Sequence, residues 1–338
     1  MVLEEFLDEW NNDRPTVLVH TSGSTGKPKP MWVEKQKMLN SARITCDFLG
    51  LKPGDSALLC MPLDYIAGKM VVVRAIERKL HLVSIAPCGH PLANVEPTTF
   101  AAMVPLQVYN SLQVPGEKQK LMAIRHLIIG GGAIDDEMAA ALRSFPNNVW
   151  STYGMTETLS HIALRRLNGK EASEWYTPFD TVGISQDEEG CLVINAPLVH
   201  DGVLKTNDRV EMRLNKAIRK QQFRIIGRKD NVIDSGGIKI QIEEVERLLK
   251  PHLNVPFVIT KTPDKKFGEV VVLLCEKPAF SSASSSFVSS ISVEELRNIC
   301  TKALPPYWVP KKYVFVDKLP MTETGKPARA EAEKMVRL

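Results

Sequence analysis

The chain has 338 residues, of which 44% are hydrophobic and 24% are charged, and its formal net charge is +4. This is the composition of an ordinary globular protein with material for one large domain or two, and so mild a basic excess gives no sign of a nucleic-acid-binding arm or a polybasic membrane anchor. No run approaches the roughly 18 apolar residues of a transmembrane helix, and the acidic, amphipathic start lacks the basic and apolar regions of a secretory signal.

The first half of the chain alternates short apolar runs with helical patterns, which is typical of α/β proteins. Residues 16–19, 126–129 and 149–151 predict strands, and a polar or glycine-rich loop follows each of them. Gly50 stands where a helix cap is expected. Two helices are predicted from apolar residues that recur on one face: Met38, Ala42, Cys46 and Leu49, then Met138, Leu142 and Phe145.

From about residue 227 onward the pattern becomes a small alternating set of strands and helices. We therefore predict a large N-terminal domain over residues 1–227 and a smaller α+β C-terminal domain over residues 228–338. The serine-rich residues 280–292 are expected to form a flexible loop. The expected elements are strands at 223–226, 255–259, 270–275 and 313–316 and helices at 242–249 and 293–303.

The loop after the first strand carries the strongest chemical signal. Its glycines allow a ligand to approach the backbone closely, and successive backbone N–H groups form a concavity that binds anions. Triphosphate is the natural ligand, although a solvated Ser/Gly turn would use the same residue types. The loop is not a Walker P-loop, because Pro28 stands where the magnesium-binding hydroxyl belongs. The predicted phosphate-binding residues are Thr21, Ser22, Gly23, Ser24, Thr25, Gly26 and Lys27.

This loop resembles the phosphate loop of the adenylate-forming superfamily, which includes acyl- and aryl-CoA ligases, firefly luciferase and nonribosomal peptide adenylation domains. Five further motifs follow in the order of that family and extend the resemblance over residues 20–329. They are Gly131-Gly132-Ala133, Tyr153-Gly154-Met155-Thr156-Glu157, Thr206-Asn207-Asp208, Gly227-Arg228-Lys229-Asp230 with Ser235-Gly236-Gly237, and Pro320-Met321-Thr322-Glu323-Thr324-Gly325-Lys326 followed by Arg329. The resemblance implies an adenylate-forming fold with a mobile C-terminal domain.

The resemblance also implies which residues are catalytic. Lys326 would stabilise the negative charge that develops at the α-phosphate of ATP, as a positioned ammonium can. Thr156 would donate a hydrogen bond to the same phosphate, and Glu157 would hold Mg²⁺, a cation that prefers carboxylate oxygen. The alternatives are a solvated loop lysine at position 326 and an ordinary turn with an exposed charge at the end of a strand.

The resemblance further implies binding sites for the nucleotide and for coenzyme A. An ionised carboxylate can accept hydrogen bonds from both ribose hydroxyls, and paired glycines allow a pantetheine chain to come close. A surface salt bridge and an ordinary linker turn are the alternatives. The implied residues are Gly131, Gly132 and Ala133 beside adenine, Tyr153 stacked on it with Gly154 of the same motif also binding the nucleotide, Asp208 at the ribose, Arg228 at ribose or phosphate, and Gly236 and Gly237 at the thiol entry.

The chain departs from the family pattern in several places. Pro30 ends the phosphate loop where a glycine is usual, Asn207 replaces the middle glycine of T-G-D, and Tyr65 stands for the histidine of the aromatic gate. Isoleucines stand at 238 and 242, where glutamate and proline are usual. Typical members carry a whole subdomain before the phosphate loop, whereas Thr21 follows only 20 residues here. We therefore expect that subdomain to be missing and part of the acyl pocket to be built differently.

The shortened form and the run from Ser235 to Glu246 are similar to the o-succinylbenzoate–CoA ligases of menaquinone synthesis. The expected function is thus an ATP-dependent acid–thiol ligase that makes an acyl-adenylate and then an acyl-CoA thioester. The alternatives are a stand-alone enzyme that loads a carrier-protein thiol and an inactive nucleotide-binding regulator. By charge alone, candidates for a second substrate carboxylate are His161, Arg165 and Lys205, for each of which a surface or core role is the alternative.

The expected cofactors and partners follow from this function. They are ATP, Mg²⁺, coenzyme A as co-substrate and a small-molecule carboxylate, with neither nucleic acid nor membrane, and a homo-oligomer is left open. The six cysteines show neither close pairing nor metal-ligand spacing, so we expect reduced thiols in a cytoplasmic protein.

Overall fold

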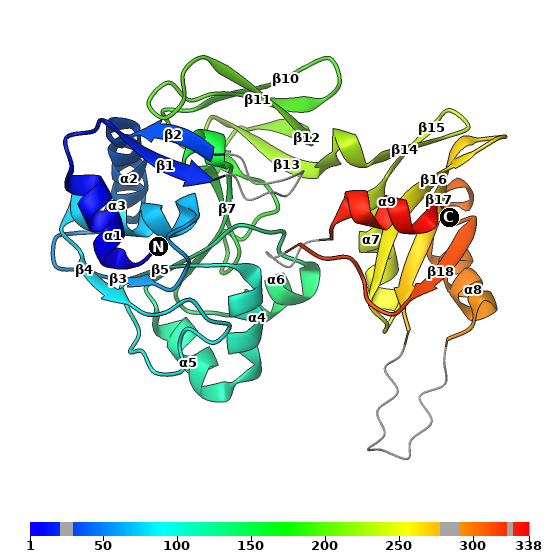
Figure 1. Cartoon of the computed structure of the whole chain (residues 1–338), viewed down its shortest axis with the longest axis horizontal. Helices are drawn as coiled ribbons and strands as arrows, with labels where there is room; N and C mark the ends of the chain where they lie inside the picture. The colour runs from blue at the N-terminus through cyan, green and yellow to red at the C-terminus, as the bar shows by residue number, and fades with distance from the viewer. Residues whose placement is uncertain (21–29, 278–290, 323–326, 338) are drawn as a thin grey trace. The chain divides into compact units, whose positions relative to one another are not determined.

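A computed structural model describes residues 1–20, 30–277, 291–322 and 327–337 (Figure 1). The predicted phosphate-binding residues Thr21 to Lys27, the predicted catalytic Lys326 and most of the serine-rich segment lie outside the described residues. The chain divides into two compact units: Met1–Asp187, Val193–Thr206 and Met212–Arg224 form one, and Glu188–Leu192, Asn207–Glu211 and Ile225–Leu338 form the other. The domain boundary at residue 227 stays a prediction.

The larger unit is built on a seven-stranded sheet in the order β4-β3-β5-β6-β7-β8-β9. Its first five strands are parallel, and β8 runs antiparallel to β7. Every residue of β5 and β6 is buried, as expected for parallel strands covered on both faces. The strands are β3 (Ser56–Leu59), β4 (His81–Ser84), β5 (Phe100–Met103), β6 (His126–Ile129), β7 (Asn148–Gly154), β8 (His161–Arg166) and β9 (Thr177–Pro178).

Among the described residues, six α-helices and a separate two-stranded sheet accompany the seven-stranded sheet. The predicted strand at 16–19 is confirmed, and it pairs antiparallel with β2 in a two-stranded sheet. Helix α2 buries the predicted face and ends at Gly50, whose φ of 65° is the left-handed cap that glycine favours. The elements are α1 (Leu3–Asn11), β1 (Thr16–His20), β2 (Pro30–Glu34), α2 (Lys35–Leu49), α3 (Ile66–Arg78), α4 (Pro105–Gln113), α5 (Pro115–Ala123) and α6 (Asp136–Leu142).

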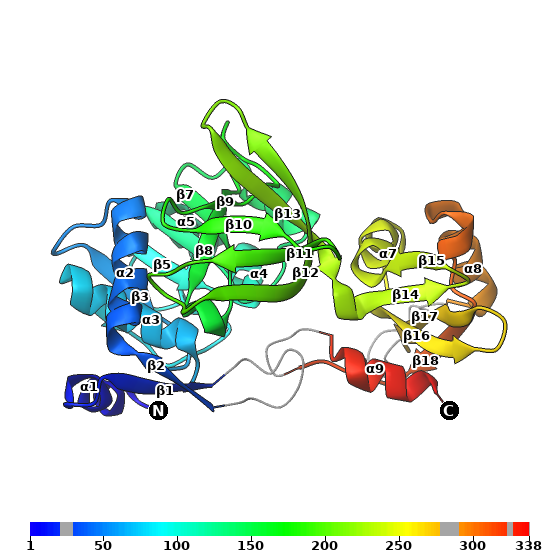
Figure 2. The same ribbon diagram turned by 90° about the horizontal axis from the view of Figure 1, so that it is seen from above.

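A four-stranded sheet follows in the order β10-β11-β12-β13, and Figure 2 shows these strands side by side. They are β10 (Gly183–Gln186), β11 (Cys191–Asn195), β12 (Val203–Asn215) and β13 (Lys220–Arg228). All six cysteines of the chain are free, and five of them are buried. In the part of the chain that is described, no helix has the length and apolar character needed to cross a membrane.

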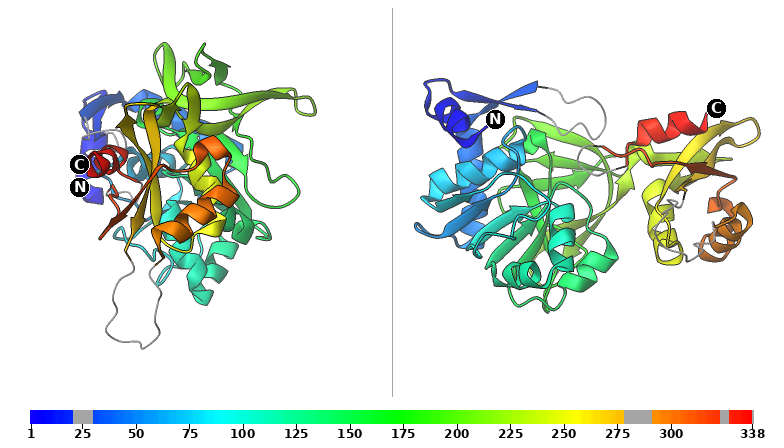
Figure 3. Two further views of the ribbon diagram at one scale, coloured as in Figure 1. Left: turned by 90° about the vertical axis from the view of Figure 1, so that its right-hand side faces the viewer. Right: turned by 60° about the horizontal axis from the view of Figure 1, so that its bottom comes forward.

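The C-terminal region has a five-stranded sheet with helices on both sides (Figure 3). Strand β17 alternates between two cores: Leu273 and Cys275 pack with helices α7 and α8, whereas Val272 and Leu274 pack with helix α9. The two predicted helices are confirmed, and the strand predicted at 255–259 begins at Phe257 and runs further. The elements are β14 (Val232–Ser235), β15 (Ile238–Gln241), α7 (Ile242–Leu249), β16 (Phe257–Asp264), β17 (Gly268–Glu276), α8 (Val293–Ala303), β18 (Lys312–Val316) and α9 (Arg329–Val336).

Candidate functional site

The turn between β7 and β8 carries two of the predicted catalytic residues. Thr156–Thr158 form a single 3₁₀ turn, and Leu159 has a φ of 63°, which is rare for a non-glycine residue. The N–H of Ser160 donates to the carbonyl of Thr158 at 2.7 Å and closes a tight reverse turn. The buried hydroxyl of Thr158 lies 2.8 Å from the carbonyl oxygen of Ser160 and 3.1 Å from that of Met155, so its one proton is shared between these two acceptors. These bonds hold the strained backbone and so present Thr156 and Glu157 in one arrangement.

Gly154 is required here for a packing reason. A Cβ at this position would lie 2.2 Å from the carbonyl oxygen of Ser160 and 2.5 Å from the Cα of His161. The pairing of β7 with β8 shifts register at the same place, between Tyr153 and Gly154. The close approach of the two strands therefore depends on the missing side chain.

We expect Gly154→Ala to destabilise the protein by about 3 kcal/mol, because the clash is with backbone that cannot rotate away. The turn at Thr156 and Glu157 should shift as well and slow adenylate formation at least about tenfold. Denaturant unfolding and a pyrophosphate-exchange assay would measure the two effects. Gly116→Ala in α5 is the matched control, since a Cβ there meets nothing within 4 Å. Equal behaviour of the two variants would contradict the packing argument.

Glu157 is suited to hold a magnesium ion. Its side chain is half-buried, and its backbone carbonyl accepts a hydrogen bond from Nδ1 of His200 at 3.1 Å. The described residues include no group of three or more His, Cys, Asp or Glu side chains that could hold a metal. A magnesium ion bound to nucleotide phosphates takes only one or two carboxylates from the protein. The carboxylate of Glu157 fits that donor set.

The predicted adenine site lies along one edge of the seven-stranded sheet. Strands β6 and β7 are parallel neighbours, so the loops after their carboxyl ends meet at the same edge. Gly131 and Ala133 in the first loop are exposed and Gly132 is half-buried. Tyr153 is only 6% exposed, and its ring packs against Phe223 with 5.0 Å between centroids. The structure therefore gives Tyr153 a core role, and its stacking on adenine stays a prediction.

Arg228 joins Asp208, the acidic residue of the predicted ribose site, to Asp230. Its Nη1 donates to Asp208 at 3.0 Å and its Nη2 donates to Asp230 at 2.9 Å. Asn207, which departs from the family pattern, donates from Nδ2 to Asp230 at 3.1 Å. The asparagine thus has a place in the network that a glycine could not fill, and the salt bridge considered from sequence is present.

Gly236 and Gly237 form the two-residue turn between β14 and β15. Their φ angles are 62° and 85°, and the flanking Ser235 and Ile238 are paired. Two central residues with positive φ are what a type I′ hairpin turn requires. The N–H of Gly237 donates to the side chain of Asp234 at 3.1 Å. Turn geometry alone explains both glycines, and their role at the thiol entry stays a prediction.

A buried set of hydrogen-bonded side chains connects the turn between β7 and β8 to helices α2 and α3. Arg74 is 2% exposed, and its Nη2 donates to Oγ of Ser160 at 2.6 Å. Ser160 Oγ lies 3.2 Å from Nδ1 of His161, whose Nε2 lies 3.0 Å from Oγ1 of Thr45. Burial lowers the pKa of Arg74 to about 10, so the guanidinium is charged at neutral pH. Within the described residues it forms no ion pair, and its Nε has no hydrogen-bond partner.

The chain matches two family models. The model for AMP-binding enzymes matches residues 4–197, which is more than half of the chain. The chain belongs to the AMP-binding enzyme family. The model for the C-terminal domain of AMP-binding enzymes matches residues 244–326. The fold of this AMP-binding enzyme is accordingly the adenylate-forming fold, with a large N-terminal and a smaller C-terminal domain, as predicted.

Similar proteins agree with this assignment. A 2-succinylbenzoate–CoA ligase from Bacillus cereus is 25% identical over 97% of this chain and 72% of its own length. An acyl-CoA synthetase (AMP-forming)/AMP-acid ligase II-like protein from Dyadobacter fermentans is 33% identical, with a TM-score of 0.63 over 97% of this chain and 91% of its own. An o-succinylbenzoate coenzyme A synthetase from Bacillus subtilis, solved with ATP and magnesium, shares the fold at 22% identity and a TM-score of 0.73, over 93% of this chain and 69% of its own.

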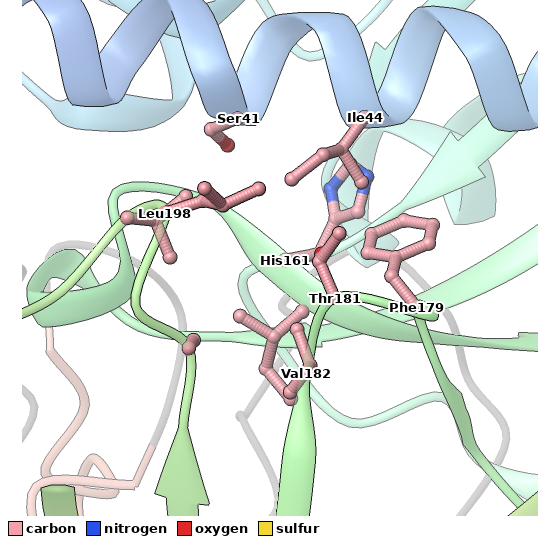
Figure 4. A pocket seen from close by; sticks show the side chains of 10 residues that line it. Ser41, Ile44, His161, Phe179, Thr181, Val182 and Leu198 are labelled. Atoms are coloured by element: carbon pink, nitrogen blue, oxygen red, sulfur yellow. The ribbon is translucent and has the colours of Figure 1, made fainter.

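Sequence reasoning on this AMP-binding enzyme missed Arg74. The available signal was a single cation inside the apolar run Met70 to Ala75, since an unpaired charge is rarely buried. Of the three cations proposed from sequence, Lys205 is exposed and Arg165 lies over the ring of Tyr176 at 5.3 Å. His161 borders a cavity of about 10 Å³ beside Phe179 (Figure 4), which is room for about one water.

His161 is held uncharged in the fold. Burial, and then the positive charge of Arg74, keep the pKa of His161 well below its ordinary value of 6.5. A histidine with a lowered folded pKa binds fewer protons than the unfolded chain does, so its contribution to stability is complete above about pH 6.5 and is lost as the pH falls below that. His161 is therefore a poor partner for a substrate carboxylate at neutral pH.

The pH dependence of stability should change in the variant His161→Gln. Between about pH 6.5 and pH 5, the wild type should lose stability relative to the variant by up to roughly 1.4 kcal/mol per pH unit. Denaturant unfolding of both proteins across this range would measure the difference, in which the other histidines cancel. Parallel stability curves would show that His161 accepts its proton normally in the folded chain.

Proposed function

We propose that this protein is an ATP-dependent acid–thiol ligase that makes an acyl-CoA thioester through an acyl-adenylate. In the first step a carboxylate oxygen bonds to the α-phosphorus of ATP, and the bond to pyrophosphate breaks. In the second step the thiol of coenzyme A loses its proton to solvent, its sulfur bonds to the acyl carbon, and AMP leaves. The observation that carries this proposal is the match to both the N-terminal and the C-terminal family models.

The side chains of the site have defined parts in this proposal. Asp208 would accept hydrogen bonds from the ribose hydroxyls, and Arg228, already bonded to Asp208, would keep that carboxylate oriented. Glu157 would hold Mg²⁺, which when bound neutralises phosphate charge during the displacement. Lys326, in its P-M-T-E-T-G-K segment, would supply the ammonium at the α-phosphate.

We further propose that the acid is o-succinylbenzoate, which would place the chain in menaquinone synthesis. The names of the relatives at about 25% identity support this substrate. The buried Arg74 also supports it, because a guanidinium without a carboxylate partner is costly in a protein interior and is compensated when an anion binds. A dicarboxylic acid keeps one carboxylate for activation and offers the second one to Arg74.

The test is turnover of a panel of acids with Mg·ATP and coenzyme A, followed by mass spectrometry of acyl-CoA and AMP. A thioester from o-succinylbenzoate alone would support both the reaction and the substrate. A thioester from another acid would keep the reaction and remove the menaquinone assignment. Acyl-adenylate without thioester would favour the alternative acceptor, a carrier-protein thiol. An absence of turnover with every acid would refute the ligase proposal and favour an inactive regulator.

A further inference from the structure

The directions of the hydrogen bonds in the buried set of side chains can be deduced from Thr45. Its hydroxyl is fully buried and donates its one proton to the carbonyl oxygen of Ser41 at 3.1 Å. The 3.0 Å contact with His161 must then be donated by Nε2–H of the imidazole. The ring is neutral, so its Nδ1 carries no proton and accepts from the hydroxyl of Ser160. This tautomer of His161 is the one in which every contact of the set is a hydrogen bond with one donor and one acceptor.

The guanidinium of Arg74 lies at the far end of this set of hydrogen-bonded side chains. Because the proton of Ser160 is committed to His161, the lone pairs of its Oγ face Arg74 and accept from Nη2 at 2.6 Å. These hydrogen bonds therefore connect three elements: α3 through Arg74, the start of β8 through His161, and α2 through Thr45. A planar guanidinium held at one nitrogen by an oriented acceptor cannot rotate freely, which directs its remaining donors.

The same hydrogen bonds connect Arg74 to the turn that carries Thr156 and Glu157. Ser160 is half-buried and belongs to the same tight turn as Thr156 and Glu157. Nε of Arg74 is buried without a hydrogen-bond partner. A buried donor of this kind costs free energy until it meets an acceptor, and the cost is larger for a charged group. The orientation of Arg74 relative to that turn is thus set by groups that carry no charge themselves.

We propose that Ser160, His161 and Thr45 are positioning residues, which hold Arg74 in the orientation that recognises the second carboxylate of a dicarboxylic substrate. This inference rests on the proposed ligase function. It goes beyond that function because it gives the uncharged hydroxyl of Thr45 in helix α2, which contacts no reacting group, a part in substrate selectivity. Thr45 acts on selectivity only through the other two residues.

The test compares the diacid o-succinylbenzoate with the two monoacids that each lack one of its carboxylates. Ser160→Ala should raise KM for the diacid roughly tenfold. It should leave kcat for the diacid, and KM for the monoacid that reacts better, nearly unchanged. Thr45→Val should act in the same direction with a smaller effect, and Thr45→Ser, which keeps the hydroxyl, should restore the wild-type ratio. Arg74→Met should raise KM for the diacid on the order of 100-fold.

A double-mutant cycle separates positioning from general structural damage. In an Arg74→Met background, Ser160→Ala should have no further effect on the diacid-to-monoacid ratio. Ser111→Ala is the matched control, because it removes another fully buried hydroxyl, bonded to Glu117 at 2.8 Å, and should leave the ratio unchanged. Thermal unfolding of each variant checks that it folds.

The outcomes are distinct. Equal losses for diacid and monoacids, or a Ser160→Ala effect that persists without Arg74, would overturn the positioning role while the ligase function stands. An unchanged diacid KM in Arg74→Met would overturn it too, since Arg74 would then contact no substrate anion. Failure of the wild type to form any thioester would overturn the proposed function itself, and this inference with it.

Discussion

Replacing Lys326 by alanine slows formation of the acyl-adenylate by roughly 100-fold or more, and thioester formation from supplied acyl-adenylate and coenzyme A survives. This is the expected result because negative charge grows at the α-phosphate only in the first step. Loss of one positioned donor removes stabilisation that the transition state needs and the ground state does not. The assignment of Lys326 rests on the P-M-T-E-T-G-K motif. Single-turnover assays of each half-reaction, followed by release of pyrophosphate and of AMP, would measure the effect.

Lys334→Ala is a matched control for that variant. Lys334 lies in helix α9, is exposed and pairs with Glu331 at 2.7 Å on the same helix. Exposed pairs of this kind contribute little to stability, so both half-reactions should keep their rates. If Lys326→Ala slowed both half-reactions equally, an assignment of the lysine to adenylation alone would be wrong.

Breaking the pair of Arg329 with Glu246 should lower the stability of the C-terminal region by about 3 kcal/mol. The pair is bidentate, with N–O distances of 2.6 and 2.7 Å, and both side chains are 22% exposed. Arg329 also donates to the carbonyl of Ile259 at 2.9 Å, and Glu246 accepts from the N–H of that residue. The pair therefore joins helices α9 and α7 to strand β16, and either single replacement leaves a partly buried charge without its partner.

Denaturant unfolding of the full chain would test this, with Glu246→Gln and Arg329→Met as the single variants. The double variant should recover part of the loss, because no unpaired charge remains. Arg337→Ala is the control, since its pair with Glu333 lies on one helix and its side chain is 60% exposed, and its effect should stay below about 0.5 kcal/mol. A single variant as stable as this control would show that the bidentate pair is not a structural clamp.

These two predictions separate the last residue of the P-M-T-E-T-G-K motif from the arginine three positions after it. The resemblance assigns Lys326 to chemistry, whereas the contacts of Arg329 are those of a residue that holds helix α9 to its neighbours. A loss of activity in Arg329→Met should accordingly be accompanied by a loss of stability. Lys326→Ala should lose activity at wild-type stability, which thermal unfolding would reveal.

Much of the candidate site was predictable because its signals are local in sequence. For Gly236 and Gly237 an ordinary turn was the alternative to a role at the thiol entry, and the structure has a tight turn there between β14 and β15. The motif around Thr156 and Glu157 follows a strand, as predicted, and the structure adds the close backbone approach at Gly154. Arg74 was not predictable in its role, since its partner Ser160 is 86 residues away.

Local signals in the sequence predicted the family, a large α/β N-terminal domain, a smaller α+β C-terminal domain, and several of their strands and helices. Periodicity and caps such as Gly50 act over a few residues, and the order of the motifs can be followed along the chain. Which charges are buried and which groups meet depends on packing between segments that are far apart in the chain. Arg74 with Ser160, Asn207 with Asp230 and Arg329 with Glu246 are brought together by packing between distant segments. Burial and partner together set the charge state and orientation of a side chain, and neither can be read from local spacing.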